Sequence, residues 1–356
     1  MFNNKEEYKM NWKKRFLLIL VALSLVLFAG CGQKEEINKA EETGKLETEN
    51  EEVKEDFVEE YGLKLYEDRV EFVDGSGREV VIPKNPERVV VLYNSYLELW
   101  AQNGGKVVGR LEESKTQDLV PGTEDAEIIG AGPSDISVEK VISLEPDLII
   151  GSPKWGEHLD MIEFWDENDI PCILLDYDGL EDYHKLVRLF TFLTDREDLY
   201  EENSVKVQKD IDEILAKVPE ESDKKVLLMH IGKGISAKDS TFWVGQIVKD
   251  FNVTNIADNN EDELNASSFS KEVIVKEDPD FILTLVMGSE DKAKEKIKSE
   301  LASDPAWNSL TAIQEDKLYF LDREILWFRP NNRYAESYLE IGKILYPEIF
   351  GELEEK

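Results

Sequence analysis

The chain has 356 residues, 41% of them hydrophobic, and its 42 Lys and Arg against 77 Asp and Glu give a formal net charge of −35. This length fits one large or two ordinary domains, and the apolar content excludes a wholly disordered chain. The negative charge argues against nucleic acid as a partner, because phosphate backbones bind basic surfaces. Two Cys exclude a disulfide scaffold, and three His argue against a metal site built from several histidines.

The first thirty residues have the pattern of a secretory signal peptide. A basic triplet at 13–15 precedes an apolar run over 16–29, which is too short for a stable membrane anchor but suits a signal peptide. The run ends in Ala-Gly-Cys31 as in a bacterial lipobox, although Leu27 stands one place earlier than usual. We therefore expect cleavage after residue 30, lipidation of Cys31 with fatty acids such as palmitate, and an extracytoplasmic protein anchored to a membrane of Gram-positive type. The alternative is an ordinary secretory signal with an incidental Cys.

A strongly acidic segment follows Cys31. Residues 34–60 contain twelve acidic and four basic residues, and such a segment cannot bury enough apolar area to offset its loss of conformational entropy. We expect a flexible tether over 31–64, with ordered structure beginning near Leu65. The alternative is an acidic helix near 53–58.

The next part of the chain alternates between strand and helix patterns. A β-hairpin is expected over 69–82, around the turn sequence Asp-Gly-Ser-Gly at 74–77. Continuous apolar runs predict strands that are buried on both faces of a parallel sheet. The expected strands are 89–92, 106–109, 148–150 and 173–175, and the expected helices are 96–102, 136–144 and 157–168. This alternation predicts an N-terminal α/β lobe over 65–194.

Residues 195–218 predict one long amphipathic helix. Val207, Ile211 and Ile214 recur at helical spacing, and neither Gly nor Pro interrupts the pattern before Pro219. The α/β alternation then starts again and predicts a C-terminal lobe over 219–356. Its expected strands are 226–229, 281–285 and 317–321, with a helix at 244–251. The predicted fold class is α/β, with two doubly wound lobes joined by one long α-helix and a ligand cleft between the lobes.

One short pattern occurs in both predicted lobes. Ser137-Val-Glu139 is followed by Pro146-Asp, and Ser270-Lys-Glu272 by Pro279-Asp, with seven residues from Glu to Pro in both. Ser is a good N-cap, and an acidic residue in the first turn suits the helix dipole. Because Pro disfavours helix at the residue before it, each copy predicts a short capped helix that leads into a buried strand.

Aromatic and basic residues follow several predicted strands, where ligands of open α/β sheets bind. Aromatic faces together with Arg suit a flat or catecholate-type ligand and its negative charge. Arg110 and Arg329 are the expected contacts to anionic groups, whereas each aromatic residue could also serve only in packing. The candidate ligand-binding residues are Tyr93, Arg110, Trp155, Tyr177, His230, Trp243, Trp327 and Arg329.

The chain has three histidines, at positions 158, 184 and 230. His230 could ligate haem iron, as could Tyr93, but a lone His at a strand end also fits a hydrogen-bonded structural role. His158 and His184 lie on predicted helices and are expected to face solvent. Cys172 is expected to be a buried strand residue without chemistry.

A series of short motifs runs from about 73 to 350. They are Asp74-Gly-x-Gly-Arg78, Ile82-Pro-x-x-Pro-Glu-Arg-Val-Val90, Val108-Gly109, Ile136-Ser-x-Glu139, Pro146-Asp-Leu-Ile149, Asn255-Ile-Ala257, Phe269-Ser-x-Glu272 and Pro305-x-Trp307. In their order and spacing they resemble the iron-complex family of solute-binding lipoproteins, which serve ABC importers for ferric siderophores, haem and cobalamin. Asn252-Val253 departs from the family pattern, which often has a Gly pair there.

The resemblance implies a bilobed monomeric receptor that captures an iron complex, most readily an Fe(III)-siderophore, and delivers it to a permease and its ATPase. It implies that Glu139 and Glu272 dock on Arg residues of the permease, and exposed carboxylates suit bidentate pairing with guanidinium groups. Both residues could instead only stabilise helix N-termini. No catalytic residue, cofactor or resident metal is implied. Because the long helix limits the hinge, we expect lobe closure of only a few degrees.

Other functions remain open at this point. A haem or cobalamin receptor belongs to the same family. An adhesin or a sensor without a transport partner would not need the two Glu residues. A hydrolase on a doubly wound fold lacks a nucleophile elbow, a phosphate loop and a dinucleotide fingerprint in this sequence. A zinc or manganese receptor would need convergent His and carboxylate ligands, which three scattered His hardly supply.

Overall fold

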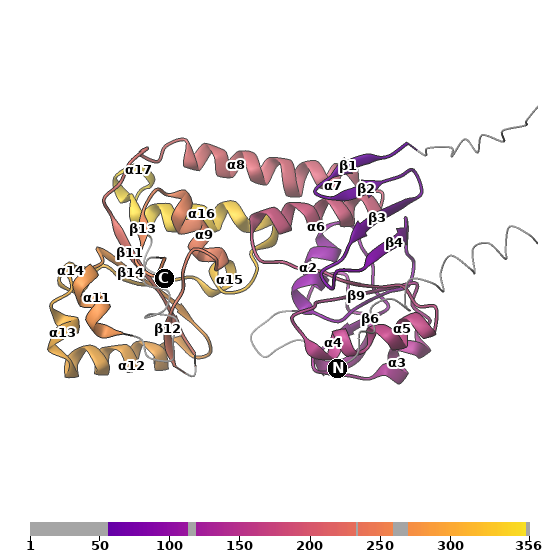
Figure 1. Cartoon of the computed structure of the whole chain (residues 1–356), viewed down its shortest axis with the longest axis horizontal. Coiled ribbons are helices and arrows are strands. Elements are labelled where there is room, and N and C mark those ends of the chain that lie inside the picture. Colours follow the sequence, from indigo (N-terminus) through magenta and orange to yellow (C-terminus); the bar gives the residue numbers. More distant parts are fainter. Residues whose placement is uncertain (1–55, 113–118, 233, 259–269, 354–356) are drawn as a thin grey trace, which may run out of the picture. The chain divides into compact units, whose positions relative to one another are not determined.

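A computed structural model of the chain describes residues 56–112, 119–232, 234–258 and 270–353 (Figure 1). The predicted signal peptide, the lipidation site Cys31 and the tether up to residue 55 lie outside the described residues. The described residues belong to one compact unit. Within the described ranges, none of the helices combines the length and apolar character that crossing a membrane requires.

A four-stranded antiparallel sheet opens the folded unit. Its strands are β1 (Val58–Glu60), β2 (Leu63–Leu65), β3 (Arg69–Val73) and β4 (Glu79–Pro83), paired in chain order. The predicted hairpin is confirmed as β3 and β4.

The expected start of order near Leu65 is too late, because β1 and β2 precede it. Leu63 and Leu65 alternate inward into the main hydrophobic core, and the carboxylate of Glu60 pairs with the guanidinium of Arg188. The acidic composition of the preceding segment argued against ordered structure, although Leu63 and Leu65 are buried in the core.

The N-terminal lobe is built on a six-stranded sheet of order β10-β9-β5-β6-β7-β8, parallel except at β8. The strands are β5 (Val89–Val91), β6 (Gly109–Leu111), β7 (Glu127–Gly132), β8 (Asp135–Ile136), β9 (Leu148–Gly151) and β10 (Cys172–Leu174). The helices are α2 (Asn94–Gln102), α3 (Val138–Ser143), α4 (Gly156–Asp160) and α5 (Ile162–Glu167). Strand β6 begins later than the expected 106–109, β7 and β8 were not expected, and the helix expected at 157–168 is divided at Met161.

Alternating side chains of this sheet enter two different cores, as a doubly wound fold requires. Val89 and Val91 of β5 pack with α2, whereas Val90 packs with Val141 of α3 and Trp165 of α5. The continuous run of β-branched residues therefore forms a strand that is buried on both faces.

The C-terminal lobe contains five strands of order β12-β11-β14-β15, with β13 also paired to β11. Only β12 runs antiparallel to β11. The strands are β11 (Lys225–Ile231), β12 (Ile235–Ala237), β13 (Thr254–Asn255), β14 (Phe281–Val286) and β15 (Leu318–Phe320). The helices are α9 (Trp243–Asp250), α11 (Lys271–Glu277), α12 (Glu290–Ser303), α13 (Pro305–Asn308), α14 (Thr311–Gln314), α15 (Arg323–Leu326), α16 (Tyr334–Leu345) and α17 (Pro347–Phe350).

The lobes are joined by helices rather than by loops. Helix α6 (Leu180–Leu193) is followed by a nearly continuous helical stretch of α7 (Glu197–Tyr200), a π-helical turn (Glu201–Val205) and α8 (Lys206–Leu215). The linking helix predicted over 195–218 is thus present but contains a π-turn, in which the carbonyl of Asn203 accepts a hydrogen bond from the hydroxyl of Tyr183. Helix α8 packs beside α16 of the C-terminal lobe (Figure 1).

One hydrophobic core includes residues of both lobes and of the linking helices. Its members include Trp100, Phe190, Ile211, Trp243, Phe251, Leu283, Tyr334 and Tyr346. Because these side chains touch in one contiguous cluster, rotation of one lobe against the other requires repacking of this core.

The packing of β2 leads to a stability prediction. Leu63→Ala should lower the free energy of unfolding by about 2–4 kcal/mol, because the fully buried leucine leaves a cavity behind. Val58→Ala in the adjacent strand is the control, since Val58 is 57% exposed and should change stability little. Urea unfolding measures both variants. Equal effects of the two substitutions would mean that β2 does not belong to the folded core.

Candidate functional site

Three predicted site residues meet where the two lobes approach each other. The guanidinium of Arg329, from the segment after α15, lies 5.0 Å from the ring centre of Tyr177 and 5.5 Å from that of Trp243. Tyr177 follows β10 in the N-terminal lobe, whereas Trp243 begins α9 in the C-terminal lobe. Nη2 of Arg329 lies 3.5 Å from the carboxylate of Asp178. Nη1 is buried and has no hydrogen-bond partner among the described residues. This group is called the Arg329 cluster below.

A buried polar network holds the same region together. Oδ1 of Asn331 accepts a hydrogen bond of 3.1 Å from the hydroxyl of Tyr177, and its Nδ2 donates one of 2.8 Å to the carboxylate of Glu98 on α2. Asn331 is fully buried and has a left-handed backbone (φ 51°), which Asn tolerates better than most residues. Burial raises the pKa of Glu98, while the bond from Asn331 opposes the increase. Asn331 therefore connects the lobes.

A second pair of predicted residues lies at the carboxyl ends of β5 and β9. The rings of Tyr93 and Trp155 are 6.2 Å apart between centres, and both are half-buried. The ring of Tyr93 also packs edge-on against Tyr96, at 5.3 Å. The hydroxyl of Tyr96 is directed to the carbonyl of Leu175 at the end of β10. The two aromatic faces thus lie on a rigid base provided by the sheet.

His230 and Trp327 form a third group. Their rings stack with centres 5.0 Å apart and planes 5° apart. Nε2 of His230 is buried and has no hydrogen-bond partner in the part of the chain that the structure describes. Burial, helped by the charge of Lys238, lowers the pKa of His230, so the ring is neutral at physiological pH. A Cβ atom at Gly232 would lie 3.1 Å from this imidazole and 3.7 Å from the sulfur of Met287, so both side chains face the same glycine.

Arg110 occupies a different environment from Arg329. It is buried, and its Nε and Nη1 each donate a hydrogen bond of 3.0 Å, to the carbonyls of Thr123 and Leu111 respectively. These bonds hold the segment after β6 against the sheet. Because Nε and Nη1 of Arg110 donate to these carbonyls, they are not directed toward the Arg329 cluster.

The expectation that His158 and His184 face solvent is wrong. His158 is fully buried, where its Nδ1 accepts from the amide of Ser152 (3.0 Å) and its Nε2 donates to the carbonyl of Pro133 (3.1 Å). His184 is buried between the hydroxyl of Ser204 and the side-chain carbonyl of Gln208. The histidines lie on faces of these helices that are buried by other parts of the chain. The local sequence pattern does not predict this burial. Burial lowers the pKa of both imidazoles.

Glu139 and Glu272 take equivalent places in the two lobes. Each is exposed and lies in the first turn of a short helix, α3 or α11. Among the described residues, neither carboxylate has an ion-pair partner. The neighbouring Lys140 pairs with Glu127 (3.2 Å), and Lys271 pairs with Asp304 (2.7 Å).

The repeat noted in the sequence extends to the hydrogen bonds around these helices. Both helices end before a residue with left-handed backbone, Glu145 (φ 47°) and Asp278 (φ 45°). The carboxylate of Asp147 accepts from the amide of Arg88 at 2.9 Å, and in the second lobe Asp280 accepts from the amide of Lys225 at 2.7 Å.

The basic side chains of the repeat act alike as well. Arg88 donates 2.8 Å to the carbonyl of Leu144, and Lys225 donates 2.9 Å to that of Glu277. Each side chain thus satisfies a carbonyl at the end of its helix, α3 or α11. These bonds fix the two helices, and with them the two Glu residues, to their sheets in the same way.

Two α/β lobes joined by helices, with aromatic and charged side chains where the lobes meet, define a bilobed binding protein. The periplasmic binding protein family matches residues 89–325, and the chain belongs to this family. The family consists of binding proteins for ABC transporters, so the chain is a substrate-binding protein and not an enzyme.

Two curated relatives come from Bacillus subtilis (strain 168). An uncharacterized ABC transporter substrate-binding lipoprotein, YvrC, is 26% identical over 78% of this chain and 86% of its own length. The iron(3+)-hydroxamate-binding protein FhuD is 28% identical over 68% of this chain and 76% of its own length.

Solved structures show the same fold. An ABC transporter substrate-binding protein from Listeria monocytogenes EGD-e has a TM-score of 0.60 at 18% identity, covering 74% of this chain and 99% of that one. S. aureus IsdE complexed with heme has a TM-score of 0.59 at 17% identity, covering 73% of this chain and 98% of that one. At such identities the likeness concerns the fold alone.

The buried His158 gives a prediction that can be measured residue by residue. Its imidazole should titrate below the ordinary value of about 6.5, because burial disfavours the charged ring. The unfolded chain then binds a proton that the folded chain does not, so this histidine should lower stability as pH falls below about 6.5. NMR of the imidazole protons against pH measures the pKa. A value at or above that of an unfolded peptide would contradict the prediction.

Proposed function

We propose that the chain is the extracytoplasmic, lipid-anchored receptor of an ABC importer, and that it captures an iron complex, most readily a ferric siderophore. The observation that carries this proposal is the Arg329 cluster. It places a guanidinium between two aromatic rings at the junction of the lobes, with Nη1 left for an acceptor on a ligand. Aromatic faces and a planar donor suit a large ligand with exposed oxygens, such as a ferric siderophore.

The charges around the cluster support a ligand with little net negative charge. The side chains of both Arg329 and Lys154 lie against the carboxylate of Asp178. Burial and the neighbouring Asp178 raise the pKa of Asp176, which indicates that carboxylates are already close together here. A multiply charged ferric catecholate would add anions to a site whose cations are paired. We therefore favour a ferric hydroxamate, the ligand class after which the relative FhuD is named.

Haem is a second candidate, and a separate observation supports it. Nε2 of His230 is unpartnered among the described residues, the ring is neutral, and Trp327 offers a flat face beside it. A neutral imidazole is a suitable axial ligand for haem iron. The structural neighbour IsdE is described with haem. Among the described residues, no feature specifically supports cobalamin as the ligand.

A ligand titration tests the proposal. In the soluble protein without its lipid, a ferric hydroxamate should quench tryptophan fluorescence in a saturable way, because Trp155, Trp243 and Trp327 lie among the proposed contacts. Arg329→Gln should weaken this binding by about tenfold or more, since it removes a charged donor from a buried site. The control is Arg196→Gln, whose exposed guanidinium pairs with the carboxylate of Asp198 at 2.6 Å.

The panel also includes ferric citrate, a ferric catecholate, haem and cobalamin, together with iron-free forms where they exist. Tight binding of haem that is lost in His230→Ala would favour the second candidate. No saturable binding by a folded protein across the panel would reject the iron-complex assignment altogether.

The shared core leads to a prediction about motion. Ligand-free and ligand-bound crystal structures should differ by a lobe rotation of only a few degrees, because a larger rotation would break contacts in the core that runs through both lobes. Small-angle scattering with and without ligand provides the same comparison in solution. A wide rotation in either measurement would contradict this prediction.

A further inference from the structure

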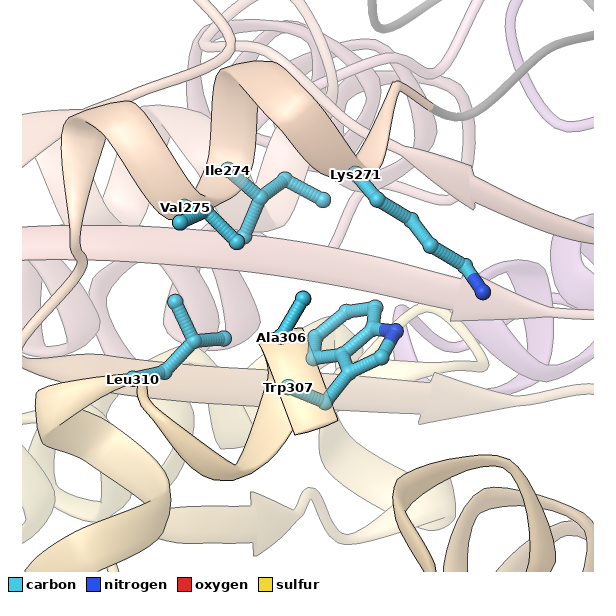
Figure 2. A pocket seen from close by; sticks show the side chains of 6 residues that line it. All are labelled: Lys271, Ile274, Val275, Ala306, Trp307 and Leu310. Carbon is cyan, nitrogen blue, oxygen red and sulfur yellow. The ribbon is translucent and has the colours of Figure 1, made fainter. Parts of the chain in front are cut away.

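The hollow between α11 and the segment 305–310 is closed by packing and admits no ligand. Figure 2 shows the side chains of Trp307 and Ile274 among those that face one another across it. Apart from Lys271 its lining is apolar, and the amine of Lys271 is held by Asp304 at 2.7 Å. The junction of the lobes, in contrast, presents charged groups to a ligand.

One carboxylate beside the Arg329 cluster holds two cations. Oδ1 of Asp178 pairs with Nζ of Lys154 in the N-terminal lobe and lies 3.5 Å from Nη2 of Arg329 in the C-terminal lobe. The side chain of Arg329 is only 18% exposed, so its guanidinium has lost most of its water and needs a counter-charge. Asp178 supplies that charge from within the protein, across the junction of the lobes.

The turn that carries Asp178 is held in place on both sides. The amide of Asp178 donates a hydrogen bond of 2.7 Å to the carboxylate of Asp182 in the first turn of α6. A Cβ atom at Gly179 would collide with the side-chain amide of Gln246 on α9, so the turn lies directly against the C-terminal lobe. The side chain of Asp178 is nevertheless 54% exposed, and its carboxylate is therefore open to a ligand that approaches Arg329.

The charges around this turn cancel. Burial and the negative charges of Asp178 and Asp182 raise the pKa of Asp176, while Lys154 and Lys185 oppose the increase. With Arg329, three carboxylates thus interact with three cations, and the formal charge of the group is zero. A neutral ligand leaves this balance unchanged. An anionic ligand group beside Arg329 would lie close to a carboxylate that is already there, and such like-charge contacts are costly.

We propose that Asp178 is a specificity-determining residue, which occupies the side of Arg329 that an anionic ligand group would take and so favours uncharged iron complexes over anionic ones. Nη1 of Arg329, which has no hydrogen-bond partner among the described residues, is the donor for a neutral acceptor such as a hydroxamate carbonyl. Hydroxamate groups together neutralise Fe(III), whereas catecholate groups leave the complex anionic. This inference rests on the proposed function and names the residue that sets its charge selectivity.

The test compares two ligands of different charge with one substitution. Asp178→Asn removes the negative charge but retains the shape of the side chain and one acceptor oxygen. Tryptophan fluorescence measures the Kd of a neutral ferric hydroxamate and of an anionic ferric catecholate. The variant should bind the catecholate about tenfold more tightly than the parent protein does, because a like charge beside Arg329 is lost. The Kd of the hydroxamate should change by less than about threefold.

Asp198→Asn is the matched control. Asp198 also pairs with an arginine, Arg196, and its side chain is 63% exposed, but it lies on α7. The substitution removes the same charge from the protein as a whole and should leave both Kd values unchanged. A catecholate affinity that stays at the parent's value in Asp178→Asn would overturn the inference. An equal change for both ligands would overturn it too, because it would indicate a structural role, as would the same shift in Asp198→Asn.

The parent protein separates this inference from the proposed function. If the parent binds the hydroxamate but Asp178→Asn leaves the ratio of the two Kd values unchanged, only the inference fails. A parent that binds the catecholate more tightly than the hydroxamate would contradict the inference alone as well. If neither protein binds any iron complex of the panel, although circular dichroism shows both folded, the proposed function fails together with it.

Discussion

The hydrophobic core shared by both lobes is the constraint on which the remaining structure depends. Trp100 and Phe190 belong to the N-terminal lobe and its following helix, whereas Trp243 and Tyr334 belong to the C-terminal lobe, and all four lie in one cluster. Close-packed interiors resist gradual deformation, so the lobes cannot separate without losing many contacts at once. The core therefore sets how far the lobes can rotate.

The candidate site is placed at the edge of this core, and its polar groups depend on the same packing. Asn331 of the C-terminal lobe accepts a hydrogen bond from Tyr177 and donates one to Glu98, both in the N-terminal lobe. These bonds persist only while the lobes keep their relative positions. Buried polar groups that lose a partner are costly, so this network strengthens the constraint imposed by the core. Arg329 therefore lies against the rings of Tyr177 and Trp243 in a fixed position. A preorganised site of this kind reduces the loss of conformational entropy on ligand binding.

The sequence predicted the main parallel strands and the linking helix, because buried parallel strands have continuous apolar runs and amphipathic helices have periodic ones. It did not predict the short strands β1, β2, β7, β8, β12 and β13, nor the helices α6 and α12. Other misses come from contacts that are distant in sequence. The inward side chains of β2 number only two, Leu63 and Leu65, within an acidic segment. His158 lies on a face of its helix that is buried by residues from another part of the chain, among them Pro133. Asn331 owes its role to Glu98, more than two hundred residues earlier, and no local pattern signals such a pair.

A fixed spacing between the lobes also bears on the docking at Glu139 and Glu272 that the family resemblance implies. Glu139 and Glu272 lie on different lobes, and each helix is held to its sheet by an Asp and a basic side chain at equivalent positions. Two charged contacts can set the orientation of a partner only if the distance between them is defined. The shared core defines that distance, and a rotation of a few degrees would change it slightly. A shared core that permits only small rotations therefore keeps Glu139 and Glu272 at a nearly constant separation.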